Sequence, residues 1–184
     1  MEFLKTASLN YHPAAKTLHW MVVVLVGAQF ITSWVMSGVR TGTPDAFLNL
    51  HMSFGLVLLP IAALLLLMRL VRPVTKLVTP APAWMSAVAT AMHYLLYILL
   101  ILLPFSGWAY ASTHHLPIKV FGLFMLPPLL EATSSIGRTF GGMHEGFASL
   151  IVVLVGIHIA AALYHHVWLK DGVLRRMLPG QGLQ

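Results

Sequence analysis

Cysteine is absent from this chain of 184 residues, and charged side chains make up only 9% of it. Without thiols the chain can form no disulfide, no cysteine-bound iron–sulfur cluster and no thiolate redox centre. Acidic residues are especially scarce, with five aspartates and glutamates against eleven lysines and arginines. Any metal or redox group must therefore be held by other side chains.

The shortage of charge also excludes a soluble domain of this size, because such a domain needs more polar surface than this chain offers. Hydrophobic residues make up 58% of the sequence, and the mean hydropathy is +0.83. Four apolar runs, at 18–38, 50–70, 86–112 and 144–169, reach the ~20 residues that a helix needs to cross a bilayer. We therefore expect an all-α membrane protein, an antiparallel bundle of four transmembrane helices forming a single domain over 1–184.

The basic residues predict how this bundle is oriented. The first run is longer than the roughly 7–15 residue core of a signal peptide, so we expect it to be retained as a helix. With both termini in the cytoplasm, eight basic residues and two acids lie inside, and three of each lie outside. This bias follows the positive-inside rule, and it explains the basic pI without nucleic-acid binding. The inner basic residues are Lys5, Lys16, Arg69, Arg72, Lys76, Lys170, Arg175 and Arg176; the outer ones are Arg40, Lys119 and Arg138.

The connection between the third and fourth runs, at 113–143, is about thirty residues long and rich in proline and glycine. Loops of this length are uncommon inside compact bundles and are often functional. Within it, residues 118–125 predict a short amphipathic element at the outer interface.

Histidine recurs within these runs. Of ten histidines, seven lie within or at the ends of the expected spans: His19, His51, His93, His144, His158, His165 and His166. Ionisable groups are rare in membranes and usually functional. His144 and His158 are fourteen residues apart, which at about 100° per residue is about 40° short of four full rotations and about 21 Å along the axis. One helix thus presents two histidines on one face at two depths.

Depth matches each of these two histidines with one from another span. His51 opens the second span at the outer side, level with His144, and His19 opens the first at the inner side, level with His158. Each pair could clamp a planar macrocycle between helices through two neutral imidazoles, and non-covalent haem b is such a group. Two filled axial positions suit electron transfer. For any one of these histidines taken singly, a plain hydrogen bond to a neighbouring helix is the alternative.

Three further features leave alternatives open. His93 either replaces His19 as the partner of His158 or hydrogen-bonds a haem propionate or a ligand. Arg69, at the inner end of the second span, either reaches lipid phosphate or holds an inner-haem propionate. The inner end of the fourth span is either an anchoring belt or a site that handles quinone and protons; its residues are His165, His166 and Trp168. Outer basic residues either steer an anion such as superoxide or form a solvated loop; they are His114, His115, Lys119 and Arg138.

Short motifs surround these histidines in a fixed order: LHW at 18–20, LHMSFG at 50–55, MHYLLY at 92–97, MHEGFASL at 143–150 and GIHIAAALYHHVWLKD at 156–171. This order resembles bacterial cytochrome b561. The resemblance extends over essentially the whole chain, including the turn at 69–73 and the closing LRRM at 174–177.

That family consists of four-helix, di-haem b cytochromes of the inner membrane that exchange electrons with quinone. Some members are linked to oxidation of superoxide at the periplasmic face, with ubiquinone as acceptor. The resemblance implies His19 and His158 as ligands of the inner haem and His51 and His144 as ligands of the outer one, in agreement with the depth argument. We therefore expect a di-haem b-type cytochrome that transfers electrons across the membrane with the quinone pool, and superoxide at the periplasmic face, with ubiquinone as acceptor, is the candidate reaction that the resemblance adds. The alternative is a non-catalytic relay subunit of a larger dehydrogenase or hydrogenase-type complex.

Overall fold

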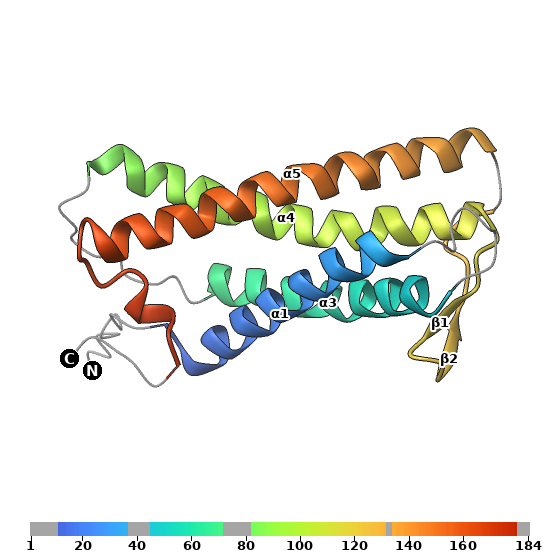
Figure 1. The fold of residues 1–184 in the computed structure, drawn as a ribbon, viewed down its shortest axis with the longest axis horizontal. Helices are drawn as coiled ribbons and strands as arrows, with labels where there is room; N and C mark the ends of the chain where they lie inside the picture. Colours follow the sequence, from blue (N-terminus) through green and yellow to red (C-terminus); the bar gives the residue numbers. More distant parts are fainter. Residues whose placement is uncertain (1–10, 37–44, 72–81, 132–133, 180–184) are drawn as a thin grey trace, which may run out of the picture.

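Four long helices lie side by side in the computed structural model, which describes residues 11–36, 45–71, 82–131 and 134–179 (Figure 1). They are α1 (Pro13–Val35), α3 (Ala46–Val71), α4 (Ala83–Thr113) and α5 (Ser134–Val167). All four are long and apolar enough to cross a membrane. The predicted all-α bundle of four membrane spans is confirmed. Four of the basic residues used for the orientation, Lys5, Arg40, Arg72 and Lys76, lie outside the described residues.

Polar residues fix where two of the helices begin. At α1 the side chain of His12 accepts a hydrogen bond from the backbone N–H of Ala14, and Pro13 occupies the first turn, where its missing N–H costs nothing. At α3 the Asp45 carboxylate accepts a hydrogen bond of 2.7 Å from the N–H of Leu48, which is the geometry of an N-cap. Both helices therefore start several residues before their apolar runs.

The helices pack in the order α1, α3, α4, α5, because the extensive backbone contacts join α1 to α3, α3 to α4, and α4 to α5. A buried aliphatic core runs along their inner faces; it includes Val22, Leu58, Ala62, Leu99 and Leu154. Large apolar side chains cover the outside, as lipid requires. Between α1 and α5 the backbones make little contact, and the polar residues described below face this side.

Exposed tryptophans stand near the helix ends. Trp34 lies near the end of α1 that the basic residues predict to face outward, which is called the outer end below. Trp84 lies at the start of α4 and Trp168 just past α5, and the three exposed fractions are 82%, 64% and 76%. Tryptophan gathers at both interfaces of a bilayer, where its ring is apolar and its N–H is wet. Their positions bracket the apolar span of the bundle.

The fourth helix starts ten residues earlier than the sequence predicts, at Ser134 rather than 144. Glycines that indicate a loop in the sequence are instead contacts between α5 and α4. A Cβ on Gly137 would lie 2.7 Å from the Thr113 hydroxyl, and one on Gly141 would lie 2.9 Å from the Tyr110 ring. Small residues allow helices to approach closely in membranes, so the apparent loop residues extend the helix.

The connection between α4 and α5 is accordingly shorter than predicted, and it holds a β-hairpin. Strands β1 (Ile118–Val120) and β2 (Phe124–Leu126) pair antiparallel, with Val120 opposite Phe124. Figure 1 shows the hairpin projecting sideways from the outer end of the bundle. Ser53 of α3 fixes it there, because its hydroxyl accepts a hydrogen bond of 2.9 Å from the N–H of Phe121. The predicted interfacial element is thus a hairpin whose first strand and turn pack on α3.

The C-terminal part of the chain returns to the start of α1. After α5 it forms a short 3₁₀ turn, η1 (Arg175–Met177). The Met177 carbonyl accepts a hydrogen bond of 2.9 Å from the Trp20 indole N–H, and the Leu178 carbonyl accepts one of 3.3 Å from the Lys16 ammonium. The start of the first helix and the end of the described chain therefore lie on the same side of the bundle.

Candidate functional site

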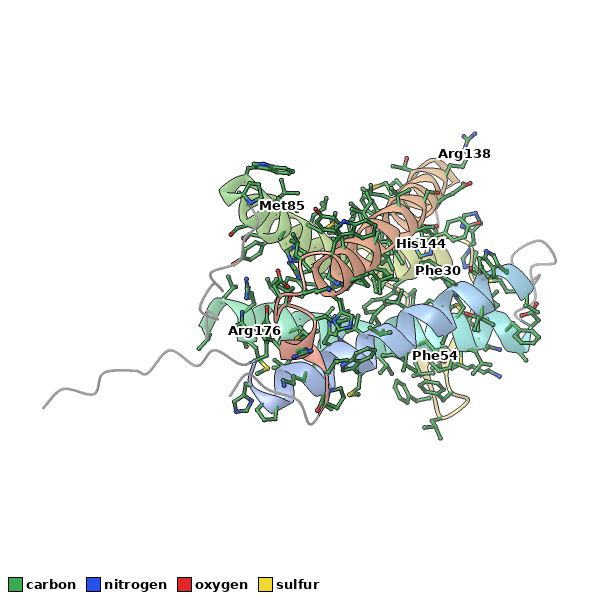
Figure 2. All side chains as sticks on the ribbon, turned by 60° about the vertical axis from the view of Figure 1, so that its left-hand side comes forward. Phe30, Phe54, Met85, Arg138, His144 and Arg176 are labelled. Atoms are coloured by element: carbon green, nitrogen blue, oxygen red, sulfur yellow. The ribbon has the colours of Figure 1, made fainter. Side chains whose placement is uncertain are left out.

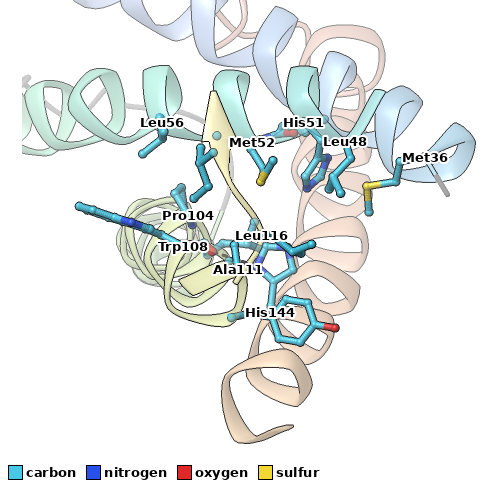
Figure 3. A pocket seen from close by; sticks show the side chains of 16 residues that line it. Met36, Leu48, His51, Met52, Leu56, Pro104, Trp108, Ala111, Leu116 and His144 are labelled. Atoms are coloured by element: carbon cyan, nitrogen blue, oxygen red, sulfur yellow. Dashed lines mark hydrogen bonds between the residues drawn. The ribbon is translucent and has the colours of Figure 1, made fainter. Parts of the chain in front are cut away.

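The outer half of the bundle brings His51 of α3 and His144 of α5 face to face across the helices. Their ring centroids are 6.2 Å apart and their planes make an angle of 77°. Figure 3 shows both rings at the same pocket, His51 from above and His144 from below. These are the two histidines that the depth argument matched at the outer side.

The His144 ring is held by α4. Its Nδ1 donates to the Leu103 carbonyl at 3.0 Å and lies 3.2 Å from the Ser106 hydroxyl. Because a carbonyl can only accept, this bond assigns the ring proton to Nδ1 and leaves Nε2 as the free acceptor. The ring also lies on Gly107, where an added Cβ would come within 2.9 Å of its Cε1 atom. The orientation of His144 is therefore fixed from two sides.

The His51 ring is held by α1. Its Nδ1 lies 3.2 Å from the Thr32 hydroxyl, and that hydroxyl is itself within 2.8 Å of the Ala28 carbonyl. With its own proton directed to Ala28, Thr32 accepts from Nδ1–H of His51. Nε2 is again the free nitrogen. A histidine that binds a metal almost always donates its other N–H in this way.

The pocket between these rings is almost entirely apolar. Its walls include Leu48 and Met52 of α3, Pro104 and Trp108 of α4, and Ile118 of the hairpin (Figure 3). Besides the two histidines, Tyr110 of α4 and Gln29 of α1 add polar groups to the lining. Gln29 is 7% exposed, and its side-chain oxygen lacks a hydrogen-bond partner among the described residues. A planar hydrophobic group with polar edges suits such a lining.

The inner half of the bundle brings three histidines together. His19 of α1 and His158 of α5 have ring centroids 6.4 Å apart, with an angle of 62° between their planes. His93 of α4 packs edge-on against His158 at 5.1 Å. The Nδ1 of His93 donates to the Ala89 carbonyl at 2.5 Å, so its proton is also assigned. The structure thus places His93 beside His158, and its role stays a prediction.

The two longer distances fit iron between the rings. Metal–imidazole bonds are about 2 Å long, and with about 1.1 Å from each nitrogen to its ring centre, two imidazoles on one iron have centres about 6 Å apart. The His51–His144 and His19–His158 distances agree with this value, whereas the His93–His158 distance is too short. The His51–His144 pair joins α3 to α5, and the His19–His158 pair joins α1 to α5. Both lie on the side where α1 and α5 make little backbone contact. The residues present therefore fit two bis-histidine haems.

The predicted quinone-site residues at the inner end of α5 are more widely separated than these histidine pairs. His165 Nδ1 lies 2.6 Å from the Asp171 carboxylate, whereas His166 is exposed. Trp168 stacks against Tyr164 with the two rings 6.4 Å apart and stays largely exposed. The predicted quinone-site residues thus share a helix end, but they do not enclose a common pocket.

The outer basic residues do not converge on the histidine pocket. Lys119 is exposed on the hairpin and Arg138 is exposed near the start of α5, and Figure 2 shows Arg138 extending away from the bundle. His114 packs its ring against Tyr110, with centroids 4.2 Å apart. Among these residues the structure favours a solvated rim over a focused anion site.

Sequence reasoning missed the buried polar residues around the outer histidines. Thr32, Ser106 and Gln29 are all buried, and each is a polar residue inside an apolar run. Their polarity is the sequence feature that could have identified them, since a buried polar group in a membrane needs a hydrogen-bond partner. The partners themselves are set by packing between helices and cannot be read from spacing.

A bundle of four membrane-crossing helices with facing histidines between them is the architecture of a membrane b-type cytochrome. The comparisons with known proteins give the same class. Residues 10–180 match the family model of prokaryotic cytochrome b561, and the chain belongs to this family.

Its relatives are similar along nearly their whole length. The probable superoxide oxidase CybB of Yersinia pestis is 30% identical over 166 residues, covering 88% of this chain and 92% of the relative. Cytochrome b561 homolog 1 of Escherichia coli K12 is 29% identical over 166 residues, covering 88% and 93%. Cytochrome b561 homolog 2 of the same strain is 29% identical over 180 residues, covering 97% and 95%. The chain is thus a multi-pass, electron-transferring cytochrome of the bacterial inner membrane.

Proposed function

We propose that this cytochrome holds two b-type haems, an outer one between His51 and His144 and an inner one between His19 and His158, and carries electrons across the membrane to the quinone pool. The observation that supports it is the pair of ring separations, 6.2 and 6.4 Å, at two depths of one bundle. When bound, each haem stores and passes a single electron.

For the reaction we propose superoxide at the outer face as donor and ubiquinone as acceptor. The name of the Yersinia pestis relative supports the donor. In the balanced reaction two superoxide anions are oxidised to two molecules of O₂, and one ubiquinone takes up two electrons and two protons to become ubiquinol. The positive-inside bias of the basic residues supports an inner location for both termini.

The chain's own residues then have separate tasks. Thr32, Leu103 and Ser106 hold the outer imidazoles so that Nε2 faces the pocket. His93 supports His158 from the side. At the inner end, the His165–Asp171 pair is suited to handing protons to a reduced quinone, because the carboxylate lies 2.6 Å from Nδ1 and orients the imidazole, and imidazole is a common proton carrier.

A difference spectrum of the purified protein, reduced with dithionite minus oxidised, tests the haem assignment. We expect b-type bands and two haems per chain. His144→Ala and His158→Ala should each remove one haem, and the two lost haems should differ in potential. Spectra without b-type bands, or loss of one common haem from both variants, overturn the pairing.

Stopped-flow mixing of the oxidised protein with superoxide, with and without ubiquinone, tests the reaction. We expect rapid reduction of the haem bands and stoichiometric formation of ubiquinol. If superoxide decays only at its spontaneous rate while quinol still reduces the protein, the chain is a relay subunit of a larger complex instead.

A further inference from the structure

Two arginines from distant parts of the sequence lie at the inner end of the bundle. Arg176 lies in η1 and is 5% exposed, although it carries a full charge. Arg69 lies in the last turn of α3. Figure 2 shows Arg176 beside the end of the bundle where α3 finishes and α1 begins.

The position of Arg176 is fixed by contacts on both sides of His19. Lys16 and Trp20, three residues before and one residue after His19, donate to the Leu178 and Met177 carbonyls. The Trp20 ring in turn packs edge-on against His19, at 5.8 Å between centroids. The C-terminal turn is therefore attached to the helix segment that carries the inner histidine.

The surroundings of Arg176 are suited to an anion. Its guanidinium lies 5.2 Å above the centre of the Tyr11 ring. Burial lowers the pKa of Arg176, the Tyr11 hydroxyl opposes this, and the positive charge of Arg69 lowers it further. Arg69 also lies within electrostatic reach of His93 and Tyr97 on α4. Two cations and two phenols thus lie at the inner end of the bundle.

We propose that Arg176 and Arg69 together bind the propionate carboxylates of the inner haem, so that the C-terminal turn is part of the haem site. The proposal rests on the proposed function above. A haem between His19 and His158 has its two carboxylates at one edge, and charged groups in a membrane lie toward the nearest water. Guanidinium groups are well matched to carboxylates, because they donate in a planar fork.

The consequence is electrostatic. Reduction adds an electron to the haem, so nearby positive charge favours the reduced form and raises the midpoint potential. Arg176→Gln should lower the potential of the inner haem while leaving that of the outer haem unchanged. A tenfold shift of the redox equilibrium corresponds to about 59 mV for one electron.

The experiment is an optical redox titration of the full-length protein, in lipid-free detergent and again in vesicles of anionic phospholipid, with the outer haem as internal reference. Arg175→Gln is the matched control, since Arg175 is the neighbouring residue with the same charge but is exposed. Arg176→Lys should retain most of the potential. Arg69→Gln, on a different helix, should lower the potential in the same direction without altering the turn.

Equal shifts in Arg175→Gln and Arg176→Gln, or an unchanged inner potential in Arg69→Gln, overturn the proposal. A shift that appears only in vesicles of anionic phospholipid overturns it as well, because the anion is then a lipid headgroup. Absence of haem from the unaltered protein overturns the proposed function itself, and this result is distinct from the others.

Discussion

Thr32 is the residue on which the orientation of His51 depends. Its hydroxyl accepts from His51 Nδ1, and loss of such a partner typically weakens metal binding by about 10- to 100-fold. We expect Thr32→Val to weaken haem retention at the outer site by roughly this factor. The measurement is the rate of haem transfer to an excess of apomyoglobin, followed separately for the two haems.

Thr17→Val is the control for that change, because the Thr17 hydroxyl also bonds within α1, to the Pro13 carbonyl, but is exposed and remote from the outer pocket. It should leave both haems in place. Equal loss of the outer haem from the two variants means that Thr32 has no orienting role.

Gly107 illustrates the close fit at the same site. A Cβ there would lie 2.9 Å from the His144 ring, and overpacking of this kind typically costs 1–3 kcal/mol. Gly107→Ala should therefore alter the electron paramagnetic resonance signal of the outer haem and lower the thermal stability of the protein. Gly142→Ala adds the same methyl group where nothing lies within 4 Å. That variant should be neutral or stabilising, since alanine favours helix by about 1 kcal/mol over glycine.

At the scale of elements, one hydroxyl of α3 is hydrogen-bonded to the turn of the hairpin. Ser53 accepts from Phe121 N–H and donates to the Asn49 carbonyl, and its removal leaves a backbone donor without its partner, at a cost of about 1–3 kcal/mol. We expect Ser53→Ala to accelerate hydrogen exchange in 118–126, measured by mass spectrometry. Ser33→Ala, whose hydroxyl bonds to Phe30 in its own helix, should leave exchange there unchanged. Unaltered exchange in both variants shows that side-chain packing alone holds the hairpin.

Elements differ in how far the sequence predicts them. The spans are predictable because apolar length alone decides whether a helix crosses lipid. The helix-four histidines are predictable as a shared face because helical periodicity is regular. The start of α5 is not, since Gly137 and Gly141 favour helix only through contacts with Thr113 and Tyr110 of α4.

The conformation of the hairpin and the burial of the C-terminal turn also cannot be predicted from the sequence. Phe121 adopts a φ of +47° beside Gly122 at +74°. Residues with side chains rarely adopt this conformation, and here it accompanies the tertiary contact with Ser53. Arg176 is buried by Tyr11 and the start of α1, more than 150 positions away in the chain. Such pairings come from tertiary structure, so the residues that tune a site are harder to predict than its ligands.

For the whole molecule, the absence of cysteine makes the orientation directly testable. Lys119→Cys and Arg175→Cys each introduce a single exposed thiol, one on the hairpin and one in η1. A membrane-impermeant maleimide should label the first in spheroplasts and the second only in inverted vesicles. The reverse pattern places the termini in the periplasm. Labelling of both thiols in either preparation indicates leaky membranes. A marker enzyme enclosed in preparations that contain the unaltered protein checks for such leakage.

Both histidine pairs include a residue of α5, which is the last of the four helices to be synthesised. A ribosome adds about 5–20 residues per second and protein segments emerge from the N-terminus. While α1, α3 and α4 enter the membrane, neither pair is complete, and both become complete when one final helix is inserted. In the proposed di-haem arrangement, neither haem can therefore be held by both of its histidines until the whole bundle has been synthesised.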